Sequence, residues 1–203
     1  MPRRTPERAE LDLCQQEKNR GQLDPKDSNR QDIALLAEKG CIGAEIGVDT
    51  GQLSERFLKL DHFSSFHSVD KWDDKAHSER QYWAVAEKLM GYSKSRIWRM
   101  TAQKFATLVP DEMFGFIYID CYAHTGQNSG EVLECMWPKL KPGGIFSGDD
   151  YDARAWKLTV AAVDAFAASV SLPITIENNF IGKNKIRMDG HPTWWIRKPE
   201  FEE

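Results

Sequence analysis

The stretch AEIGVDTGQLS, residues 44–54, links an apolar run to a helical pattern through a turn that contains Gly47 and Gly51. Glycines at the end of a strand let the backbone turn tightly and approach a ligand, while the N–H groups of the next helix face the same crevice. The following apolar run, FHSVD, ends in Asp70. An acid at that place accepts hydrogen bonds from the ribose hydroxyls of a nucleoside lying across the strand ends. The two features together predict a nucleoside site.

Apolar, strand-like runs alternate with helical patterns over most of the chain. The runs cover residues 41–48, 66–69, 96–100, 114–119 and 143–148, and the helical patterns between them cover 53–60, 79–90, 104–109 and 129–140. Such alternation indicates βαβ units and a parallel sheet. After a helical pattern over 156–170, two further strands at 174–178 and 192–198 are joined without a helix, which predicts an antiparallel pair. The prediction is one α/β domain with a mostly parallel seven-stranded sheet and helices on both faces.

Composition narrows the class of protein. The chain has 203 residues, 41% of them hydrophobic and 29% charged, which fits a single soluble globular domain. Residues 1–27 are dense in charge and predict an arm or short helix outside the core, with the folded domain over 28–203. The formal net charge of -4 disfavours nucleic acid as a partner. No apolar run is long enough for a membrane span or a signal peptide, so we expect a cytoplasmic protein. The sequence leaves open whether the chain forms a homo-oligomer.

The glycine turn alone also fits a plain strand-to-helix connection or a dinucleotide site. A dinucleotide motif would place a second glycine where Asp49 stands, and a carboxylate there would repel a diphosphate. This substitution favours a nucleoside ligand that carries a positive charge.

Four segments, EIGVDTG, SVDKW, YID and LKPGGIFSGDDY, together resemble the class I S-adenosylmethionine (SAM) dependent methyltransferases, which have a Rossmann-like fold. The branch includes the macrolide sugar O-methyltransferases and, more distantly, catechol O-methyltransferase. The resemblance runs from about residue 33 to residue 195. It implies that Glu45, Gly47 and Gly51 flank the methionine part of SAM, that Asp70 holds the ribose, and that Trp72, Ala102 and Gln103 lie near the adenine. A large aromatic such as Trp72 fits equally well in a core.

Acidic residues end two neighbouring strands of the predicted sheet. Asp120 follows the run FGFIYI, and Asp149 and Asp150 follow GGIFSG. Three carboxylates in one place raise one another's pKa unless a cation compensates them, and a hard divalent ion takes such oxygen ligands. These acids also fit a turn that caps the next helix. The resemblance implies the first arrangement, with Asp120, Asp149 and Asp150 holding Mg²⁺ that binds the acceptor oxygens.

His124 follows Asp120 in the segment DCYAHTGQ. A neutral imidazole is suited to removing a proton from a hydroxyl group. The resembling sugar enzymes carry a histidine three residues after the strand-end aspartate as general base; the interval here is four, so Tyr122 is the second candidate. The other four histidines, which are His62, His67, His77 and His191, are interpreted as structural or surface groups.

The function predicted from these residues is methyl transfer to a small hydroxylated molecule such as a sugar, polyol or phenol, with Asp120 and His124 at the reacting centre. Three alternatives stay open at this point. They are a metal-independent N- or nucleic-acid methyltransferase, a nicotinamide-dependent oxidoreductase, and a SAM-binding protein without catalysis. No residue pattern in the sequence identifies the molecule that accepts the methyl group.

Overall fold

The computed structural model describes residues 28–75, 77–177, 180–181, 186–187 and 191–200. The predicted arm over 1–27 lies outside the described residues. The helices are α2 (Ser28–Leu35), α3 (Gln52–Lys59), α4 (Glu79–Leu89), α5 (Ala102–Ala106), α6 (Gly126–Ser129), α7 (Glu131–Met136) and α8 (Lys157–Val170), with 3-10 turns η2 (Ala123–Thr125) and η3 (Trp137–Lys139). The strands are β1 (Ile42–Ile46), β2 (Ser65–Asp70), β3 (Ser95–Arg99), β4 (Phe114–Ile119), β5 (Leu140–Gly148), β6 (Thr175–Glu177), β7 (Phe180–Ile181), β8 (Ile186–Arg187) and β9 (Thr193–Arg197).

Seven strands form one mixed sheet in the order β3-β2-β1-β4-β5-β9-β6. Strands β1 to β5 pair in parallel, whereas β9 is antiparallel to both β5 and β6. The α/β fold predicted from the alternation of apolar runs and helical patterns is therefore confirmed. The small antiparallel pair β7-β8 is a difference, because no strand was predicted between those at 174–178 and 192–198.

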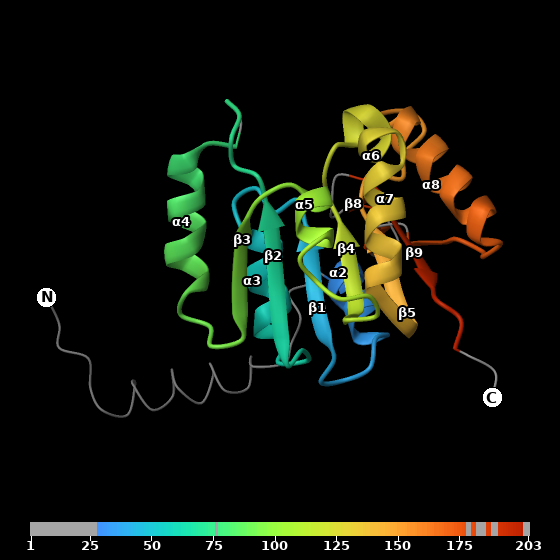
Figure 1. The fold of residues 1–203 in the computed structure, drawn as a ribbon. Coiled ribbons are helices and arrows are strands. Elements are labelled where there is room, and N and C mark those ends of the chain that lie inside the picture. The colour runs from blue at the N-terminus through green and yellow to red at the C-terminus, as the bar shows by residue number, and fades with distance from the viewer. Residues whose placement is uncertain (1–27, 76, 178–179, 182–185, 188–190, 201–203) are drawn as a thin grey trace, which may run out of the picture.

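Two layers of helices cover the sheet, as Figure 1 shows, with α5, α7 and α8 on one face and α2, α3 and α4 on the other. Each face has its own buried cluster. Phe146 and Trp194 belong to the first cluster, and Phe57 and Phe116 to the second. Every residue of β4 is buried, because this central strand has a helical layer on each side, and that is why its sequence is a continuous apolar run.

The register brings the carboxyl ends of the central strands level with one another. Ile46 at the end of β1 lies opposite Ile119 at the end of β4, and Ile119 lies opposite Gly148 at the end of β5. The amide of Asp120 donates to the carbonyl of Ile46 over 2.8 Å, and the amide of Asp149 donates to that of Ile119 over 3.1 Å. The residues that follow these strands are therefore held at one edge of the sheet.

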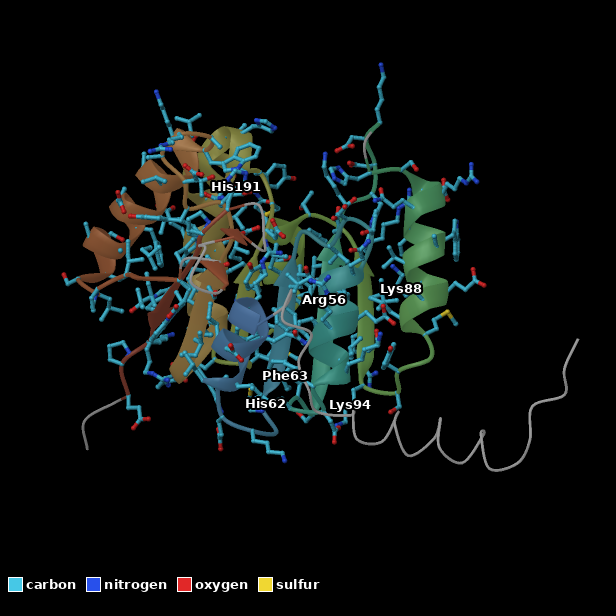
Figure 2. The ribbon with its side chains drawn as sticks, turned by 180° about the vertical axis from the view of Figure 1, so that it is seen from behind. Arg56, His62, Phe63, Lys88, Lys94 and His191 are labelled. Carbon is cyan, nitrogen blue, oxygen red and sulfur yellow. The ribbon has the colours of Figure 1, made fainter. Side chains whose placement is uncertain are left out.

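The opposite edge, where the parallel strands begin, carries ordinary packing residues. In Figure 2, His62, Phe63 and Lys94 lie at that edge, while His191 lies at the other. The ring of Phe63 lies 5.1 Å from that of Phe66, and the His62 side chain contacts the carbonyl of Ala37. Within the described residues, no helix has both the length and the apolar character that a membrane span requires.

Candidate active site

The glycine turn after β1 is fixed by steric contact with the neighbouring strand. Gly47 has φ +94°, and a Cβ atom there would lie 2.1 Å from the carbonyl oxygen of Asp120. Its amide donates to the carbonyl of Val69 over 2.9 Å. Gly51, with φ +73°, directly precedes α3. Only glycine fits position 47, because an L-residue would meet both an unfavourable backbone conformation and the end of β4.

Asp70 at the end of β2 holds this turn in place. Its Oδ2 accepts hydrogen bonds from the amides of Val48 at 2.8 Å and Asp49 at 3.0 Å, while Oδ1 accepts from the amide of Trp72 at 3.2 Å. An ionised carboxylate has about four acceptor positions, so three amides leave capacity for a ligand hydroxyl. Asp70 therefore links the turn to the adjoining cavity.

Two cavities meet at the carboxyl edge of the sheet. The first, of about 280 Å³, is bordered by Ile46, Val69, Asp70, Met100, Ala102 and the segment 120–125, among others. The second, of about 340 Å³, is bordered by Arg30, Glu45, Thr50, Leu53 and Arg56, among others. Gly47, Asp49, His77 and Asp120 border both. The cavities thus form a continuous hollow across the ends of β1, β2 and β4.

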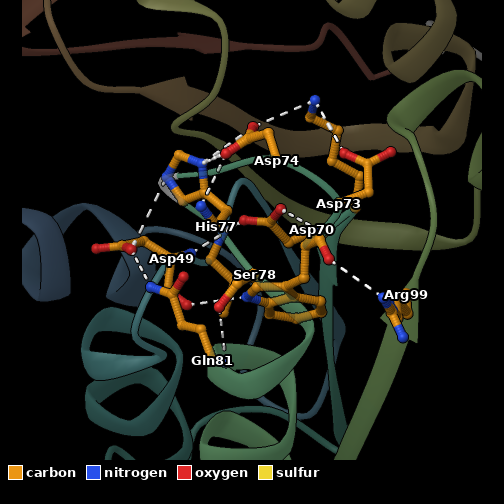
Figure 3. Close-up of polar contacts among 11 residues, drawn as sticks. Asp49, Asp70, Asp73, Asp74, His77, Ser78, Gln81 and Arg99 are labelled. Carbon is orange, nitrogen blue, oxygen red and sulfur yellow. Dashed lines mark hydrogen bonds and ion pairs between the residues drawn. The ribbon is translucent and has the colours of Figure 1, made fainter.

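The loop between β2 and α4 forms one wall of the hollow (Figure 3). The amide of His77 donates to Asp74 over 2.8 Å, and its ring Nε2 lies 3.9 Å from Asp49. Lys71 forms an ion pair with Asp74 at 3.3 Å, and Gln81 donates to Asp49. His77 was expected to be a structural or surface group. It instead faces both cavities, which sequence spacing could not indicate because the loop folds back over the turn.

Glu45 is 1% exposed and faces the second cavity from within β1. Its carboxyl accepts a hydrogen bond from Ser54, whose hydroxyl lies 2.7 Å from that of Ser68. Burial holds the pKa of Glu45 well above its usual range, and the nearby Asp120 carboxyl adds to the shift. Glu45 thus presents a carboxyl that favours its neutral form to the second cavity, which suits a polar ligand group, and its place beside the methionine part of SAM stays a prediction.

The three strand-end acids are close enough to interact. Burial raises the pKa of Asp120 to about 8, and the neighbouring Asp149 carboxyl contributes to that shift. Burial and Asp149 likewise raise the pKa of Asp150 to about 6. The prediction that these acids lie over one edge of the sheet agrees with the geometry.

Arg30 of α2 supplies the compensating charge. Its guanidinium forms an ion pair with Asp149, and the two side chains are only 14% and 9% exposed. The guanidinium also lies 5.9 Å from the centre of the Tyr118 ring. No local pattern in the sequence indicated this contact, because 119 positions separate the two residues.

The predicted magnesium site over Asp120, Asp149 and Asp150 is not supported. Asp149 already has the Arg30 cation as a partner, and a divalent ion would have to displace it or bind beside it. Within the described part of the chain, no group of three or more His, Cys, Asp or Glu side chains is arranged to hold a metal ion. The residues present therefore do not fit Mg²⁺.

His124 lies in η2 at the rim of the first cavity. Its ring centre is 4.6 Å from that of Trp156, and Trp156 in turn is 5.5 Å from His191. Tyr122 borders the same cavity, and burial raises the pKa of its phenol. Both candidate bases thus border the same cavity as Asp120. Trp156 contacts His124, whereas the sequence pattern had predicted only that it begins a helix.

The residues predicted near an adenine ring lie in three different settings. Ala102 is buried at the start of α5 and borders the first cavity. Gln103 donates to Glu131 of α7 over 3.1 Å. Trp72 is fully buried, and its indole N–H donates to the carbonyl of Asp49 over 3.0 Å, so it supports the turn from the core. Of these three residues, Ala102 borders one of the two cavities, whereas Gln103 and Trp72 border neither.

The fold and the site define a methyltransferase-like architecture, and the sequence identifies the family. A family model described as "Methyltransferase domain" matches residues 44–151, so the chain belongs to this family. The matched segment contains the glycine turn, Asp70 and all three strand-end acids. No curated protein sequence matches the chain.

Solved structures with the same fold act on different acceptors, according to their descriptions. One is a SAM-dependent O-methyltransferase from Thermotoga maritima, with 10% identity, a TM-score of 0.63, and coverage of 87% of this chain and 67% of that one. Another is the N-methyltransferase NodS from Bradyrhizobium japonicum in complex with S-adenosyl-L-homocysteine (SAH), with 14% identity, a TM-score of 0.62, and coverage of 88% and 90%. A third is precorrin-6y C5,15-methyltransferase from Geobacter metallireducens, with 11% identity, a TM-score of 0.60, and coverage of 87% and 90%. At these identities the likeness concerns the fold.

Proposed function

We propose that the chain transfers the methyl group of SAM to a hydroxyl oxygen of a small molecule. The observation that carries this proposal is the hollow at the carboxyl edge of the sheet, where Asp70, Gly47 and Asp120 from three strand ends border connected cavities. The nucleoside would occupy the cavity of about 280 Å³ with its ribose on Asp70. The methionine part would extend past Gly47 into the cavity of about 340 Å³ beside Glu45.

The charge of the hollow favours SAM over a dinucleotide. Asp49 borders both cavities, at the junction that a diphosphate would have to cross. A carboxylate there repels a diphosphate, whereas Asp49 attracts the sulfonium and the amino group of SAM. This supports methyl transfer over the nicotinamide-dependent alternative.

The acceptor would bind on the side of the hollow that His124 borders. The ring centre of Trp156 lies 4.6 Å from that of His124, so Trp156 would offer an aromatic surface to a sugar or phenol ring there, while His124 accepts the proton of the acceptor hydroxyl. SAM, when bound, supplies the methyl group, whose bond to sulfur breaks as the bond to the acceptor oxygen forms. Tyr122 is a weaker base here, because burial keeps its phenol protonated. Metal assistance is not part of this proposal, since Asp149 is paired with Arg30.

Calorimetry on the full chain tests the cofactor. SAH should bind and NAD⁺ should not. Asp70→Asn should weaken SAH binding about 10-fold to 150-fold, because a charge-assisted hydrogen bond contributes about 1.5–3 kcal/mol. The matched control is Asp111→Asn, the same change at a carboxylate that is 67% exposed and paired with Lys139 on the surface. Equal SAH affinity in the two variants would remove Asp70 from the ribose site.

Turnover tests the reaction. The chain is incubated with SAM and separate sugars, polyols and phenols, and products are analysed by mass spectrometry for one added methyl group. Methylation on oxygen supports the proposal, and methylation only on a nitrogen of amine-containing acceptors would replace it with the N-methyltransferase alternative. SAH binding without turnover on any acceptor class would favour a binding protein.

A further inference from the structure

Arg30 occupies the place at which the strand-end acids would otherwise require an added cation. It pairs with Asp149 at the end of β5, and both side chains are largely removed from water. The charge of Arg30 also acts on Asp120 and Asp150, the other two acids of this edge. Arg30 therefore pairs directly with Asp149, and its charge lowers the pKa of Asp120 and Asp150 against the effect of burial.

The same side chain reaches the methionine end of the hollow. Arg30 borders the cavity of about 340 Å³ together with Glu45, Gly47 and Asp120. A guanidinium carries five N–H donors in a planar fork, which suits an oxygen ligand that bears or develops negative charge. The Arg30 side chain thus lies between the strand-end acid Asp149 and the second cavity.

We propose that Arg30 is the resident cation of the strand-end acids, a residue that takes the place of a divalent metal ion beside Asp149. The role of Arg30 in turnover rests on the proposed methyl transfer. Its effect on the binding of divalent ions does not depend on that reaction. A buried arginine cannot lose its proton, so its charge persists at every pH at which the protein is folded. Turnover therefore needs no divalent ion, and the arginine keeps such ions out by repulsion.

Binding of Mn²⁺ measures this exclusion without reference to activity. The wild-type chain with SAH is titrated with Mn²⁺ alone by electron paramagnetic resonance, beside Arg30→Met and Arg30→Lys. Arg30→Met removes the charge and should tighten Mn²⁺ binding by about tenfold or more, because each unit charge within a few ångströms changes the affinity at least that much. Arg30→Lys keeps the charge and should bind Mn²⁺ as the wild type does.

A second substitution assigns the ion to the strand ends. Adding Asp149→Asn to Arg30→Met should abolish the gain, whereas a gain that persists would place the ion elsewhere and overturn the proposal. Thermal unfolding checks that each variant is folded, and Arg30→Gln replaces Arg30→Met if the latter is not. Tight Mn²⁺ binding by the wild type, or no gain in either neutral variant, would also overturn it.

Turnover with a chelator separates this proposal from the proposed function. Where a methylated product forms, wild-type turnover should be unchanged by EDTA, and loss of turnover with EDTA would refute the role of Arg30. Absence of any product would refute the proposed function, while the Mn²⁺ titration would still decide the electrostatic exclusion. Loss of SAH affinity in Arg30→Met without a gain in Mn²⁺ binding would instead assign Arg30 to the methionine carboxylate.

Discussion

Replacing Gly47 with alanine directly tests the geometry of the glycine turn after β1. The new Cβ would stand 2.1 Å from the carbonyl oxygen of Asp120, far inside van der Waals contact, at a backbone φ of +94°. The backbone conformation alone costs about 1–2 kcal/mol for an L-residue. Separating the ends of β1 and β4 to admit the methyl group costs about 1–3 kcal/mol more. The expected loss in the free energy of unfolding is therefore about 2–5 kcal/mol.

Gly40 provides the matched control. Its φ is +86°, close to that of Gly47, but a Cβ there has no neighbour within 4 Å. Gly40→Ala should therefore show the backbone cost without the clash. For a chain of this size each kcal/mol lowers Tm by about 2–4 °C, so Gly47→Ala should unfold about 2–12 °C below Gly40→Ala.

Two measurements decide the matter: thermal unfolding by circular dichroism, and SAH binding by calorimetry. The Gly47→Ala change moves Asp120 and the Val48 amide that Asp70 holds, so SAH affinity should fall at least about tenfold, a change of about 1.4 kcal/mol. Gly40→Ala should bind SAH normally, because the turn before β1 lies at the other edge of the sheet. If the two variants had the same Tm and the same affinity, the close approach of β1 and β4 would not be a requirement of the site.

Three further substitutions test a buried histidine and the two candidate bases. Burial lowers the pKa of His67 to about 4 from the ordinary 6.5, so the folded chain resists a proton that the unfolded chain accepts. The free energy of unfolding is therefore unaffected by the protonation of His67 above about pH 6.5 and falls by at most about 3 kcal/mol as the pH drops towards about 4. In urea unfolding, His67→Gln should lose less free energy of unfolding than the wild type over this pH range. An unchanged pH dependence in the variant would contradict the assignment. His124→Gln should lower kcat by about 100-fold or more, while Tyr122→Phe should have a small effect. Both are followed by methyl-transfer rates at saturating SAM, and the opposite order would make Tyr122 the base.

The sheet could be predicted from sequence because its pattern is carried by local apolar runs. The run FGFIYI coincides with β4 at both ends, and every end of the other parallel strands lies within three residues of its predicted limit. Elements with weak local signals were missed. The short helix α6 contains residues with positive φ such as Gln127, the 3-10 turn η2 is flanked by two more, Tyr122 and Gly126, and neither element shows a helical spacing of apolar side chains.

The candidate site divides in the same way. Asp70 and Gly47 could be predicted because strand ends in a parallel sheet necessarily meet at one edge. The partner of Asp149 could not, because Arg30 reaches it from a helix that precedes β1, and an ion pair between distant segments leaves no spacing pattern. Trp72 illustrates a third case: its position in the chain was adjacent to the site, but the side chain turns into the core to brace the carbonyl of Asp49.

The strand order has a consequence for how such a protein can diversify. The crossover between β1 and β4 divides the edge, with Asp70, the proposed ribose ligand, on the β2 side and His124, Asp149 and Trp156 on the β5 side. On the proposed function, substitutions in the segment after β5 should therefore reshape acceptor selectivity while the donor half remains intact. This division makes residues 150–156 the rational place to build libraries for new acceptors, with Asp70, Gly47 and the segment 122–125, which borders the proposed nucleoside cavity, kept constant.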